Sequence, residues 1–328
     1  MPFVDKNVLI TGGAGFIGSN LAIRLVELGA RVTVMDSMLP GYGGNLFNLE
    51  DIKNSVAINF SDMRDPHSLA YLVRDKDYIF NLAGQVSHQD SMNDPMMDME
   101  INVKAQLVLL EACRHFNPEV VVVYASTRQF YGHPEYLPVD ERHPINPPDV
   151  NGINKLAGEQ YHTLYCKIFG LKTVSLRLTN TYGPRQLIKN ARQGFIGWFM
   201  NRVITGNSIQ LFGGGDQIRD FNHVDDVVEA FLYAAVTPEC YGQFFNLSGE
   251  KTSLKSVAEN LVAYSGEGAV EVIPFPEERK KIDIGNFYGN SEKFQSVCGW
   301  KPKVLLLEGL QSTLDYYQLH SSKYLEEQ

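Results

Sequence analysis

Short apolar runs alternate with longer amphipathic stretches along the first half of the chain. The apolar runs have the length of buried strands and cover residues 7–11, 31–36, 55–60, 78–82, 120–125 and 172–177. The stretches between them repeat apolar residues at helical spacing and cover residues 16–28, 67–74, 96–116 and 153–169. Strands and helices that alternate in this way form right-handed crossovers in a parallel sheet. The pattern therefore predicts an α/β fold with a doubly wound, Rossmann-type sheet.

The composition narrows the class of protein. Asp and Glu outnumber Lys and Arg by 38 to 29, and a net charge of -9 does not suit a surface that binds nucleic acid or an anionic membrane. No segment approaches the ~20 consecutive apolar residues of a membrane span, and no signal peptide is expected. The four cysteines lie far apart, without the spacing of a metal site. We therefore expect a cytoplasmic protein with free thiols, no metal, and no nucleic-acid or membrane partner.

A glycine-rich turn follows the first predicted strand. Gly12, Gly15 and Gly18 recur at regular intervals, and a predicted helix begins among them at Phe16. Gly12 allows a tight turn, Gly15 lets backbone N–H groups approach a pyrophosphate, and Gly18 lets the helix pack closely on the strand. This strand–turn–helix context predicts a dinucleotide site formed by the three glycines together with Phe16 and Ile17.

An acidic residue, Asp36, ends the second predicted strand. It lies near the ~20-residue offset at which a carboxylate accepts hydrogen bonds from the adenosine ribose. The same carboxylate would repel the 2′-phosphate of NADP, and neither Ser37 nor Met38 supplies the arginine that NADP favours. The cofactor predicted from these residues is therefore NAD.

The alternation of strands and helices breaks down after about Arg177, where glycine-rich loops appear. A chain of 328 residues is long enough for two domains. We expect an NAD-binding domain over residues 1–178, with a later return segment near residues 221–247. The rest of residues 179–328 is expected to form a smaller C-terminal lobe that binds substrate.

With these motifs the chain resembles, along nearly its whole length, the extended short-chain dehydrogenase/reductases, a family of nucleotide-sugar epimerases, dehydratases and decarboxylases. The resemblance implies further contacts with NAD. Asp62 corresponds to the acidic residue that binds adenine, and Lys155 to the lysine that holds the nicotinamide ribose. The other corresponding cofactor residues are Met63, Leu82, Ala83, Gly84 and Asn102.

The same resemblance implies a catalytic hydroxyl and a substrate site. Thr127 corresponds to the catalytic hydroxyl. Asn180 and Arg219 correspond to residues that bind the diphosphate of a nucleotide sugar, for which an acidic protein must supply local donors. Gln85 and Arg128 complete the implied substrate site.

One residue departs from the family pattern. The family's catalytic tyrosine, four residues before the lysine, falls at Asn151, whereas Lys155 is present. In the usual arrangement a tyrosine phenolate removes a proton from the sugar hydroxyl as hydride leaves. A carboxamide cannot be that base. Asn151 could instead orient a sugar hydroxyl or a water, or cap the N-terminus of the following helix.

Three explanations for the missing phenol stay open. His88 follows the fourth strand at the cofactor-facing edge of the sheet and could be the base, while Asp90 could transfer the proton itself or orient the ring. Lys155 could act as the base if burial and the nicotinamide charge lower its pKa enough. The site could also bind cofactor and sugar without turnover.

The reaction predicted from the resemblance is an epimerisation. The family's 4,6-dehydratases carry an acidic pair directly after the threonine, and Arg128-Gln129 at this position cannot supply its acid–base chemistry. We therefore predict an NAD-dependent nucleotide-sugar epimerase. The alternatives are an NAD-dependent sugar dehydrogenase or dehydratase, and a catalytically weak nucleotide-sugar binder. Arg128 would suit a substrate carboxylate or phosphate, as in a uronic acid sugar.

The resemblance also implies a homodimer. The family commonly pairs its subunits through the two helices that correspond to residues 96–116 and 153–169. Apolar residues on these helices could form such a contact or face the sheet instead; they are Leu107, Leu110, Leu164 and Ile168.

Overall fold

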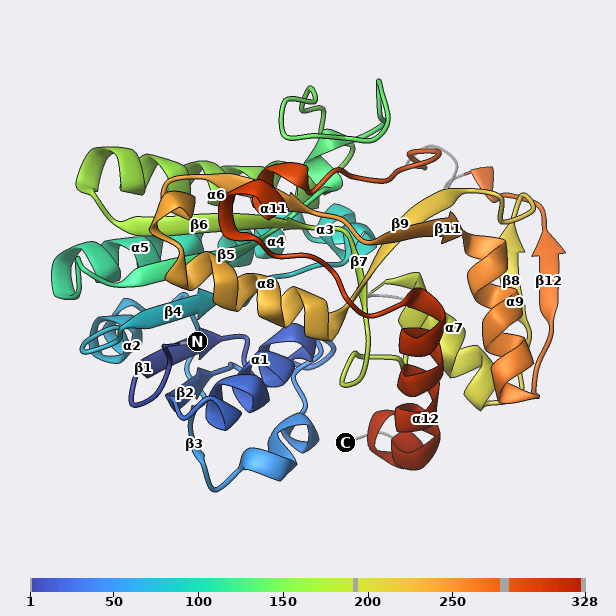
Figure 1. Ribbon diagram of the computed structural model, residues 1–328, viewed down its shortest axis with the longest axis horizontal. Coiled ribbons are helices and arrows are strands. Elements are labelled where there is room, and N and C mark those ends of the chain that lie inside the picture. The colour runs from blue at the N-terminus through green and yellow to red at the C-terminus, as the bar shows by residue number, and fades with distance from the viewer. Residues whose placement is uncertain (1, 191–193, 278–282, 326–328) are drawn as a thin grey trace.

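A seven-stranded parallel sheet forms the centre of the larger part of the molecule (Figure 1). The computed structural model describes residues 2–190, 194–277 and 283–325. The strands of this sheet are, in chain order, β1 (Asn7–Thr11), β2 (Arg31–Met35), β3 (Val56–Asn59), β4 (Tyr78–Asn81), β5 (Val121–Thr127), β6 (Lys172–Leu178) and β10 (Phe244–Leu247). The first six match the strands expected from the sequence, which confirms the predicted Rossmann-type fold.

The strand order, β10-β6-β5-β4-β1-β2-β3, reverses between β1 and β4. From β1 the chain proceeds outward through β2 and β3, and it then returns to the other side of β1 with β4, β5 and β6. Ligands of open parallel sheets bind at the carboxyl ends of the strands where the order reverses. The fold therefore directs the ends of β1 and β4 toward a binding site.

Helices cover both faces of the sheet because successive side chains of each strand point to opposite sides. Val8 and Ile10 of β1 share a core with residues of two helices, α1 (Phe16–Glu27) and α8 (Val224–Val236). Leu9 of the same strand belongs to the opposite core. The helices of that core are α2 (Pro66–Leu72), α5 (Ala105–Phe116) and α6 (Val150–Phe169). A sheet covered in this way needs strands that are apolar throughout, as the sequence pattern indicated.

The helix expected over residues 96–116 is divided into three parts. They are α4 (Pro95–Met99), a π-helical turn η2 (Glu100–Lys104), and α5. Asn102 lies in the π turn, and its side chain bonds both the backbone N–H (3.2 Å) and the carbonyl oxygen (3.0 Å) of Gln85. π turns inside α-helices frequently occur at functional sites. Here the turn fixes the segment that follows β4.

Two further helix boundaries differ from the sequence prediction. The helix expected to begin at Ile153 begins at Val150. Residues directly after β4, where no helix was predicted, form the short helix α3 (His88–Asn93), which Ser87 caps. Both differences lie near the carboxyl edge of the sheet.

The remaining elements form a smaller lobe with its own apolar core (Figure 1). Its strands make a three-stranded sheet, β11-β9-β7, and a two-stranded sheet, β12-β8. The lobe's strands and helices are β7 (Asn180–Tyr182), α7 (Phe195–Ile204), β8 (Ile209–Phe212), β9 (Ile218–His223), β11 (Glu250–Ser253), α9 (Leu254–Ser265), β12 (Val270–Ile273) and α12 (Leu306–Leu325). The remaining helices are η1 (Leu46–Ile52), η3 (Gln129–Tyr131), η5 (Pro238–Cys240) and α11 (Glu292–Cys298). Because α8 and β10 return to the main sheet between β9 and β11, and α11 packs against β10 before α12 begins, the chain enters the lobe three times.

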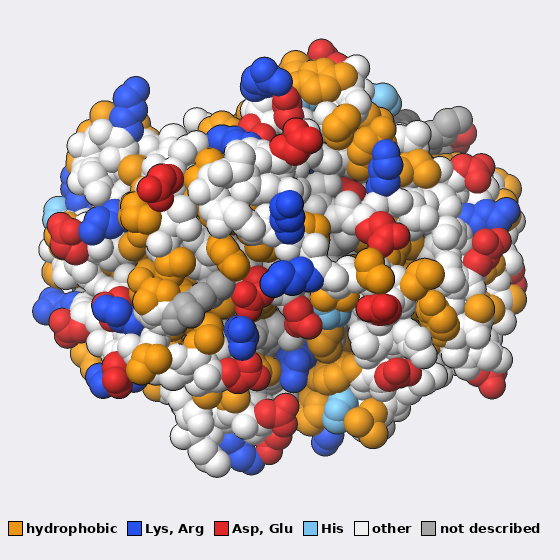
Figure 2. Space-filling view, viewed as in Figure 1, with side chains coloured by type: hydrophobic (Ala, Val, Ile, Leu, Met, Phe, Trp, Pro, Cys, Tyr) orange, Lys and Arg blue, Asp and Glu red, His pale blue; other side chains and the backbone are white. Residues whose placement is uncertain are grey.

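The surface carries charges of both signs. On the face drawn in Figure 2, Lys and Arg side chains are interspersed with Asp and Glu side chains. Among the described residues, no helix is long and apolar enough to cross a membrane, and no cluster of three or more His, Cys, Asp or Glu side chains could hold a metal ion. The four cysteines are free thiols.

Candidate active site

A cavity of about 1060 Å³ runs along the carboxyl edge of the main sheet and reaches into the smaller lobe. Its lining comes from the segments that follow β1, β2, β4 and β5, from the start of α6, and from lobe residues such as Phe195 and Arg219. Ligand pockets usually enclose about 300–1000 Å³. The cavity therefore has room for a dinucleotide and a second ligand together.

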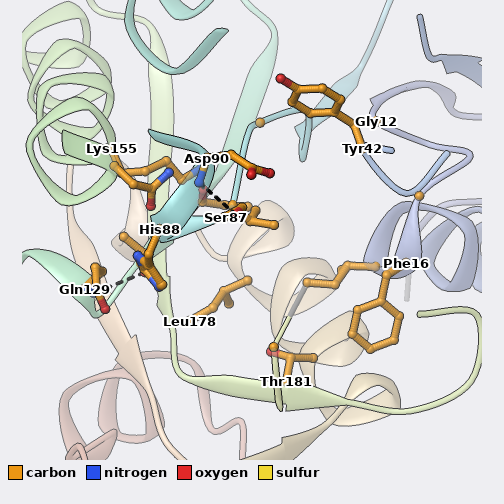
Figure 3. Close-up of a pocket in the computed structure, with 18 of the residues that line it drawn as sticks. Gly12, Phe16, Tyr42, Ser87, His88, Asp90, Gln129, Lys155, Leu178 and Thr181 are labelled. Atoms are coloured by element: carbon orange, nitrogen blue, oxygen red, sulfur yellow. Dashed lines mark hydrogen bonds between the residues drawn. The ribbon is translucent and has the colours of Figure 1, made fainter. Parts of the chain in front are cut away.

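The glycine turn between β1 and α1 lies at one end of the cavity, where Figure 3 shows Phe16. Gly12 has a φ of 68°, and a Cβ at Gly18 would lie 2.2 Å from the carbonyl oxygen of Gly12. Glycine is required at both positions. No side chain caps α1 at Gly15, so the N–H groups of the first helical turn, which includes Ile17, are available to a phosphate.

Asp36 lies beside this turn, directly after β2. Its carboxylate accepts hydrogen bonds from the backbone N–H groups of Ala14 (3.1 Å) and Met38 (3.0 Å). Burial raises the pKa of Asp36, although these two hydrogen bonds oppose the shift. The carboxylate is therefore fixed against the glycine turn, where the ribose of a bound dinucleotide would lie.

The other residues implied for NAD fall into two groups. Those that line the cavity are Met63, Leu82, Ala83, Gly84 and Lys155. Asp62 does not line it, and its carboxylate pairs with the Arg64 guanidinium at 2.7 Å. Asn102 is fully buried behind the cavity against Gln85. Asp62 and Asn102 thus make contacts within the protein, and their contacts with NAD stay predictions.

Lys155 is buried at the centre of the site. Its Nζ donates a hydrogen bond to the carbonyl oxygen of Ala125 at 2.8 Å. Desolvation lowers the pKa of Lys155 to about 8, against the opposing effect of the Asp98 and Glu159 carboxylates. The ammonium group is therefore held close to its titration at neutral to mildly alkaline pH.

Asn151 occupies the first turn of α6 and lines the cavity. Its Nδ2 donates to the carbonyl oxygen of Gln85 at 2.9 Å and to Asp98 Oδ2 at 3.2 Å. The N-cap of α6 is Asp149, whose Oδ1 accepts a hydrogen bond from the N–H of Gly152 at 2.7 Å. The prediction that Asn151 caps this helix is therefore wrong, and its side chain belongs to the site.

Thr127 ends β5 and lines the cavity. The preceding residue, Ser126, donates a hydrogen bond to Glu159 Oε2 at 2.7 Å. Glu159 in turn forms a fully buried ion pair with Arg177 of β6 at 2.5 Å. This network joins β5, β6 and α6, so the Thr127 hydroxyl stands on a rigid support.

His88 begins α3, and Figure 3 shows its ring at the same end of the cavity as Lys155. Its Nδ1 lies 2.9 Å from Asp149 Oδ2, although the ring is not aligned for a hydrogen bond. Burial acts to raise the pKa of Asp149, but the contact with His88 and the hydrogen bonds from Gly152 and Gln129 hold it below its ordinary value. Asp149, and not Asp90, is thus the carboxylate at the His88 ring.

Asp90 also lines the cavity, and its backbone N–H donates to Ser87 Oγ at 3.2 Å (Figure 3). Gln85, expected to bind substrate, does not line the cavity. Its side chain is buried and donates to the carbonyl oxygen of Ser87 at 3.0 Å. Gln85 therefore shapes the segment after β4 from behind.

Arg128 and Arg219 face the cavity from the two parts of the molecule. The Arg128 guanidinium stacks at 4.7 Å on the ring of Phe287, and its Nη1 is buried without a hydrogen-bond partner among the described residues. Burial, followed by repulsion from Arg219, lowers the pKa of Arg128 to about 10. Asn180 lines the cavity nearby, where its Nδ2 donates to the carbonyl oxygen of Asp220 at 2.9 Å. Two crowded guanidinium groups with an unsatisfied donor suit an anionic ligand.

Comparison with known proteins identifies the family. The model of the NAD dependent epimerase/dehydratase family matches residues 8–247. The chain belongs to this family. It is 33% identical over 316 residues to the UDP-glucose 4-epimerase of Mycolicibacterium smegmatis, which covers 94% of this chain and 98% of that protein. The resemblance predicted from the sequence is therefore confirmed.

Two solved structures of the epimerase/dehydratase family are similar along nearly the whole chain. The UDP-glucose 4-epimerase of Thermotoga maritima with UDP-glucose has a TM-score of 0.86 and 30% identity, covering 96% of this chain and 99% of that one. The UDP-glucose 4-epimerase of Thermus thermophilus in complex with NAD has a TM-score of 0.83 and 31% identity, covering 95% and 98%. NAD, predicted from Gly12 to Gly18 and Asp36, is the cofactor of the family.

Two acidic residues of this epimerase/dehydratase site, Asp149 and Asp98, were not predicted from the sequence. Asp149 directly precedes a helix, and aspartate is a preferred N-cap, so its position carried a usable signal. Asp98 lies one helical turn before Asn102 and shares a helix face with it. Polar residues on one face of this otherwise apolar helix would have indicated that Asp98 lies at the site. They would not have indicated that Asn151 is its partner.

Proposed function

We propose that the protein is an NAD-dependent nucleotide-sugar epimerase, which oxidises one sugar hydroxyl transiently and returns the hydride to the other face of the sugar. The observation that carries this proposal is the single cavity that joins the glycine turn to Thr127, Lys155 and Arg219. The family and the similar UDP-glucose 4-epimerases support it. Arg128 and Gln129 beside the threonine argue against dehydratase chemistry, because they cannot replace an acidic pair.

The dinucleotide site fits NAD. The close approach of Gly18 to Gly12 and the uncapped start of α1 form a cradle that a larger side chain would fill. In this cradle α1 would hold the pyrophosphate, Asp36 the adenosine ribose and Lys155 the nicotinamide ribose. NAD supplies the acceptor for the hydride when it is bound. Because Asp36 would repel a 2′-phosphate, the dissociation constant of NADP should exceed that of NAD.

His88 is the residue to which we assign transfer of the hydroxyl proton. A carboxylate beside Nδ1, here that of Asp149, favours the tautomer in which Nδ1 carries the hydrogen and Nε2 is free to accept a proton. The same carboxylate stabilises the imidazolium that forms. Catalytic hydrogen bonds are often poorly aligned before substrate binds, so the misaligned contact is compatible with this role. Thr127 supplies only a hydroxyl that donates or accepts a hydrogen bond.

Lys155 is the competing candidate for the base, since burial lowers its pKa to about 8. Its hydrogen bond to Ala125 favours a supporting role as a cation. His88→Ala should lower kcat by roughly 10²-fold or more if the imidazole transfers the proton. Asp149→Asn should also lower kcat. Asp90→Asn makes the same change at the neighbouring carboxylate and is compared with it. Near wild-type rates in both His88→Ala and Asp90→Asn would assign the proton to Lys155.

The two arginines support a substrate that carries more than one anionic group. Asn180 and Arg219 would bind the diphosphate of the nucleotide sugar. Arg128 directly follows Thr127 and has a buried, unsatisfied donor, so we propose that it meets a charge on the sugar itself, such as the carboxylate of a uronic acid. UDP-glucuronic acid should then be preferred to UDP-glucose, and Arg128→Leu should abolish the preference.

Incubation of the NAD-loaded protein with a panel of nucleotide sugars, followed by NMR of the products, tests the reaction. An epimerase yields a stereoisomer of the substrate without net NADH. Net NADH with a ketone or an acid would indicate a dehydrogenase, and loss of water a dehydratase. Calorimetric binding of panel members without conversion of any would support the weak binder instead.

A homodimer through α6 is a further part of the proposal. Ile153 (55% exposed), Leu164 (46%) and Ile168 (60%) lie along one exposed stripe of this helix. Leu110 is fully buried in the core beneath the sheet, and Leu107 packs partly against that core, so these two do not extend the stripe. Light scattering should report about twice the chain mass of 36.8 kDa, and a monomeric mass would refute the dimer.

A further inference from the structure

A buried carboxylate lies directly behind Asn151. Asp98 of α4 is 1% exposed. Its two oxygens accept hydrogen bonds from two side-chain amides of α6, those of Asn154 (2.7 Å) and Asn151 (3.2 Å). No cation forms an ion pair with Asp98 in the part of the chain that the structure describes. Since a buried carboxylate is costly unless hydrogen bonds satisfy it, these two amides are strongly constrained.

The partners of Asn151 determine the orientation of its carboxamide. Its nitrogen donates to the carboxylate of Asp98 and also to the carbonyl oxygen of Gln85 at 2.9 Å. Both partners only accept hydrogen bonds, so a carboxamide rotated by 180° would place its oxygen against two acceptors. Gln85 cannot easily move away, because the Asn102 side chain bonds its backbone on both sides. Both amide hydrogens of Asn151 are therefore committed to the protein.

The oxygen of Asn151 is left for the cavity. Oδ1 accepts no hydrogen bond from the described residues, and Asn151 lines the cavity together with Thr127 and Lys155. We infer that Asp98 is a positioning residue that locks Asn151 as a one-way hydrogen-bond acceptor for the reacting hydroxyl of the sugar. The inference rests on the proposed function for the identity of the ligand, but the lock itself depends only on contacts within the chain.

An acceptor-only group distinguishes the two oxidation states of the sugar. A hydroxyl can donate a hydrogen bond to Asn151 Oδ1, whereas a keto oxygen has only lone pairs to present to it. The lock therefore stabilises the alcohol relative to the ketone. This preference suits a redox-neutral reaction, in which the hydride must return before the ketone can leave. Because the hydroxyl carries a single hydrogen, its bond to Asn151 Oδ1 holds the sugar before reaction, and the hydroxyl must turn from Asn151 to His88 for the proton to be transferred.

The test is to exchange the carboxylate at position 98 with the carboxamide at position 154. In Asp98→Asn, the carboxamide at position 98 carries a donor at one end, so it cannot accept from both Asn151 and Asn154. In the double variant Asp98→Asn/Asn154→Asp, the carboxamide at position 98 can donate to the carboxylate at position 154 and present its oxygen to Asn151. The double variant keeps the net charge and restores an acceptor behind Asn151.

The first readout is the affinity of the NAD-loaded protein for UDP-glucose, measured by calorimetry. Asp98→Asn should weaken binding about three- to tenfold, the value of one hydrogen bond, and the double variant should recover most of this loss. The dissociation constant of NAD should change less than that of UDP-glucose in Asp98→Asn, because Asp98 acts on NAD only through the charge of Lys155. In an Asn151→Ala background, Asp98→Asn should have no further effect on UDP-glucose affinity, whereas a purely structural role of Asp98 would persist there.

An unaffected single variant, or a double variant as impaired as the single one, would overturn the inference. Failure of the wild type to bind UDP-glucose would also count against it, because Asn151 would then have no sugar hydroxyl to orient. Binding without conversion of any nucleotide sugar would refute the epimerase proposal alone, since the affinities of the variants would still decide whether Asp98 locks Asn151.

Discussion

The buried imidazole of His162 makes the stability of the protein depend on pH in a defined way. His162 lies in α6, is fully buried, and stacks on the ring of Tyr124 at a centroid distance of 4.3 Å. Burial lowers the pKa of His162 from 6.5 to about 4, against the hydrogen bond to Gly158 and with some help from Lys155. Between these pH values the unfolded chain binds a proton that the folded chain excludes. The contribution of His162 to stability is therefore complete above pH 6.5, falls as the pH decreases toward 4, and falls no further below it.

The size of this effect follows from the shift. One pKa unit corresponds to about 1.4 kcal/mol, so His162 alone should lower the free energy of unfolding by about 3 kcal/mol across the window. In His162→Gln the carboxamide cannot ionise, and this contribution should disappear. Urea unfolding of both proteins at several pH values should show that the free energy of unfolding of the wild type falls relative to that of His162→Gln as the pH decreases from 6.5 to 4.

An exposed histidine supplies the matched control. His67, at the start of α2, is exposed, and His67→Gln should leave the pH dependence of unfolding unchanged. Unfolding free energies of wild type and His162→Gln that run parallel through the acidic range would refute the reasoning. Such a result would mean that the imidazole is protonated in the folded state, in spite of its burial.

Three other changes have expected outcomes. Gly18→Val should weaken NAD binding by about tenfold or more, because the added side chain meets the carbonyl oxygen of Gly12, and an unchanged dissociation constant by fluorescence titration would contradict this. Glu159→Gln breaks the buried ion pair with Arg177 and should lower the free energy of unfolding by about 3–5 kcal/mol, whereas a loss below about 1 kcal/mol would show that the pair is dispensable. If Lys155 acts as a cation, turnover should fall as the pH rises through about 8, and a rate that rises there would favour Lys155 as the base.

Features that depend on neighbouring residues could be predicted from the sequence. The glycine turn lies between a strand and a helix that are adjacent in the chain, so Gly12, Gly18 and Asp36 pointed to a dinucleotide site without knowledge of the fold. The six alternating strands likewise determined the sheet, because the order and hand of βαβ crossovers leave few arrangements.

Contacts between distant segments could not be predicted in the same way. Asp98 and Asn151 are 53 positions apart, and they meet only because helix α4 and helix α6 pack together. The partner of Asp62 within the protein could not be predicted either. Its place in the family pattern predicts a contact with adenine, and Arg64 of this chain also pairs with its carboxylate. A motif gives the position of a residue, whereas its partners depend on the neighbours that this chain supplies.

Restoring the family's tyrosine at Asn151 would test whether proton transfer has moved to another residue. A phenol at this position would face Asp98, whose negative charge favours the protonated form and raises the pKa of a phenol. A phenol has one donor where the carboxamide has two, so either Asp98 or Gln85 would lose its partner. We therefore expect Asn151→Tyr to lower kcat/KM, and Asp98→Leu/Asn151→Tyr to be more active than Asn151→Tyr alone. If Asn151→Tyr instead exceeded the wild-type rate, the missing phenol would be the limiting defect, and His88 could not be the residue that replaced it.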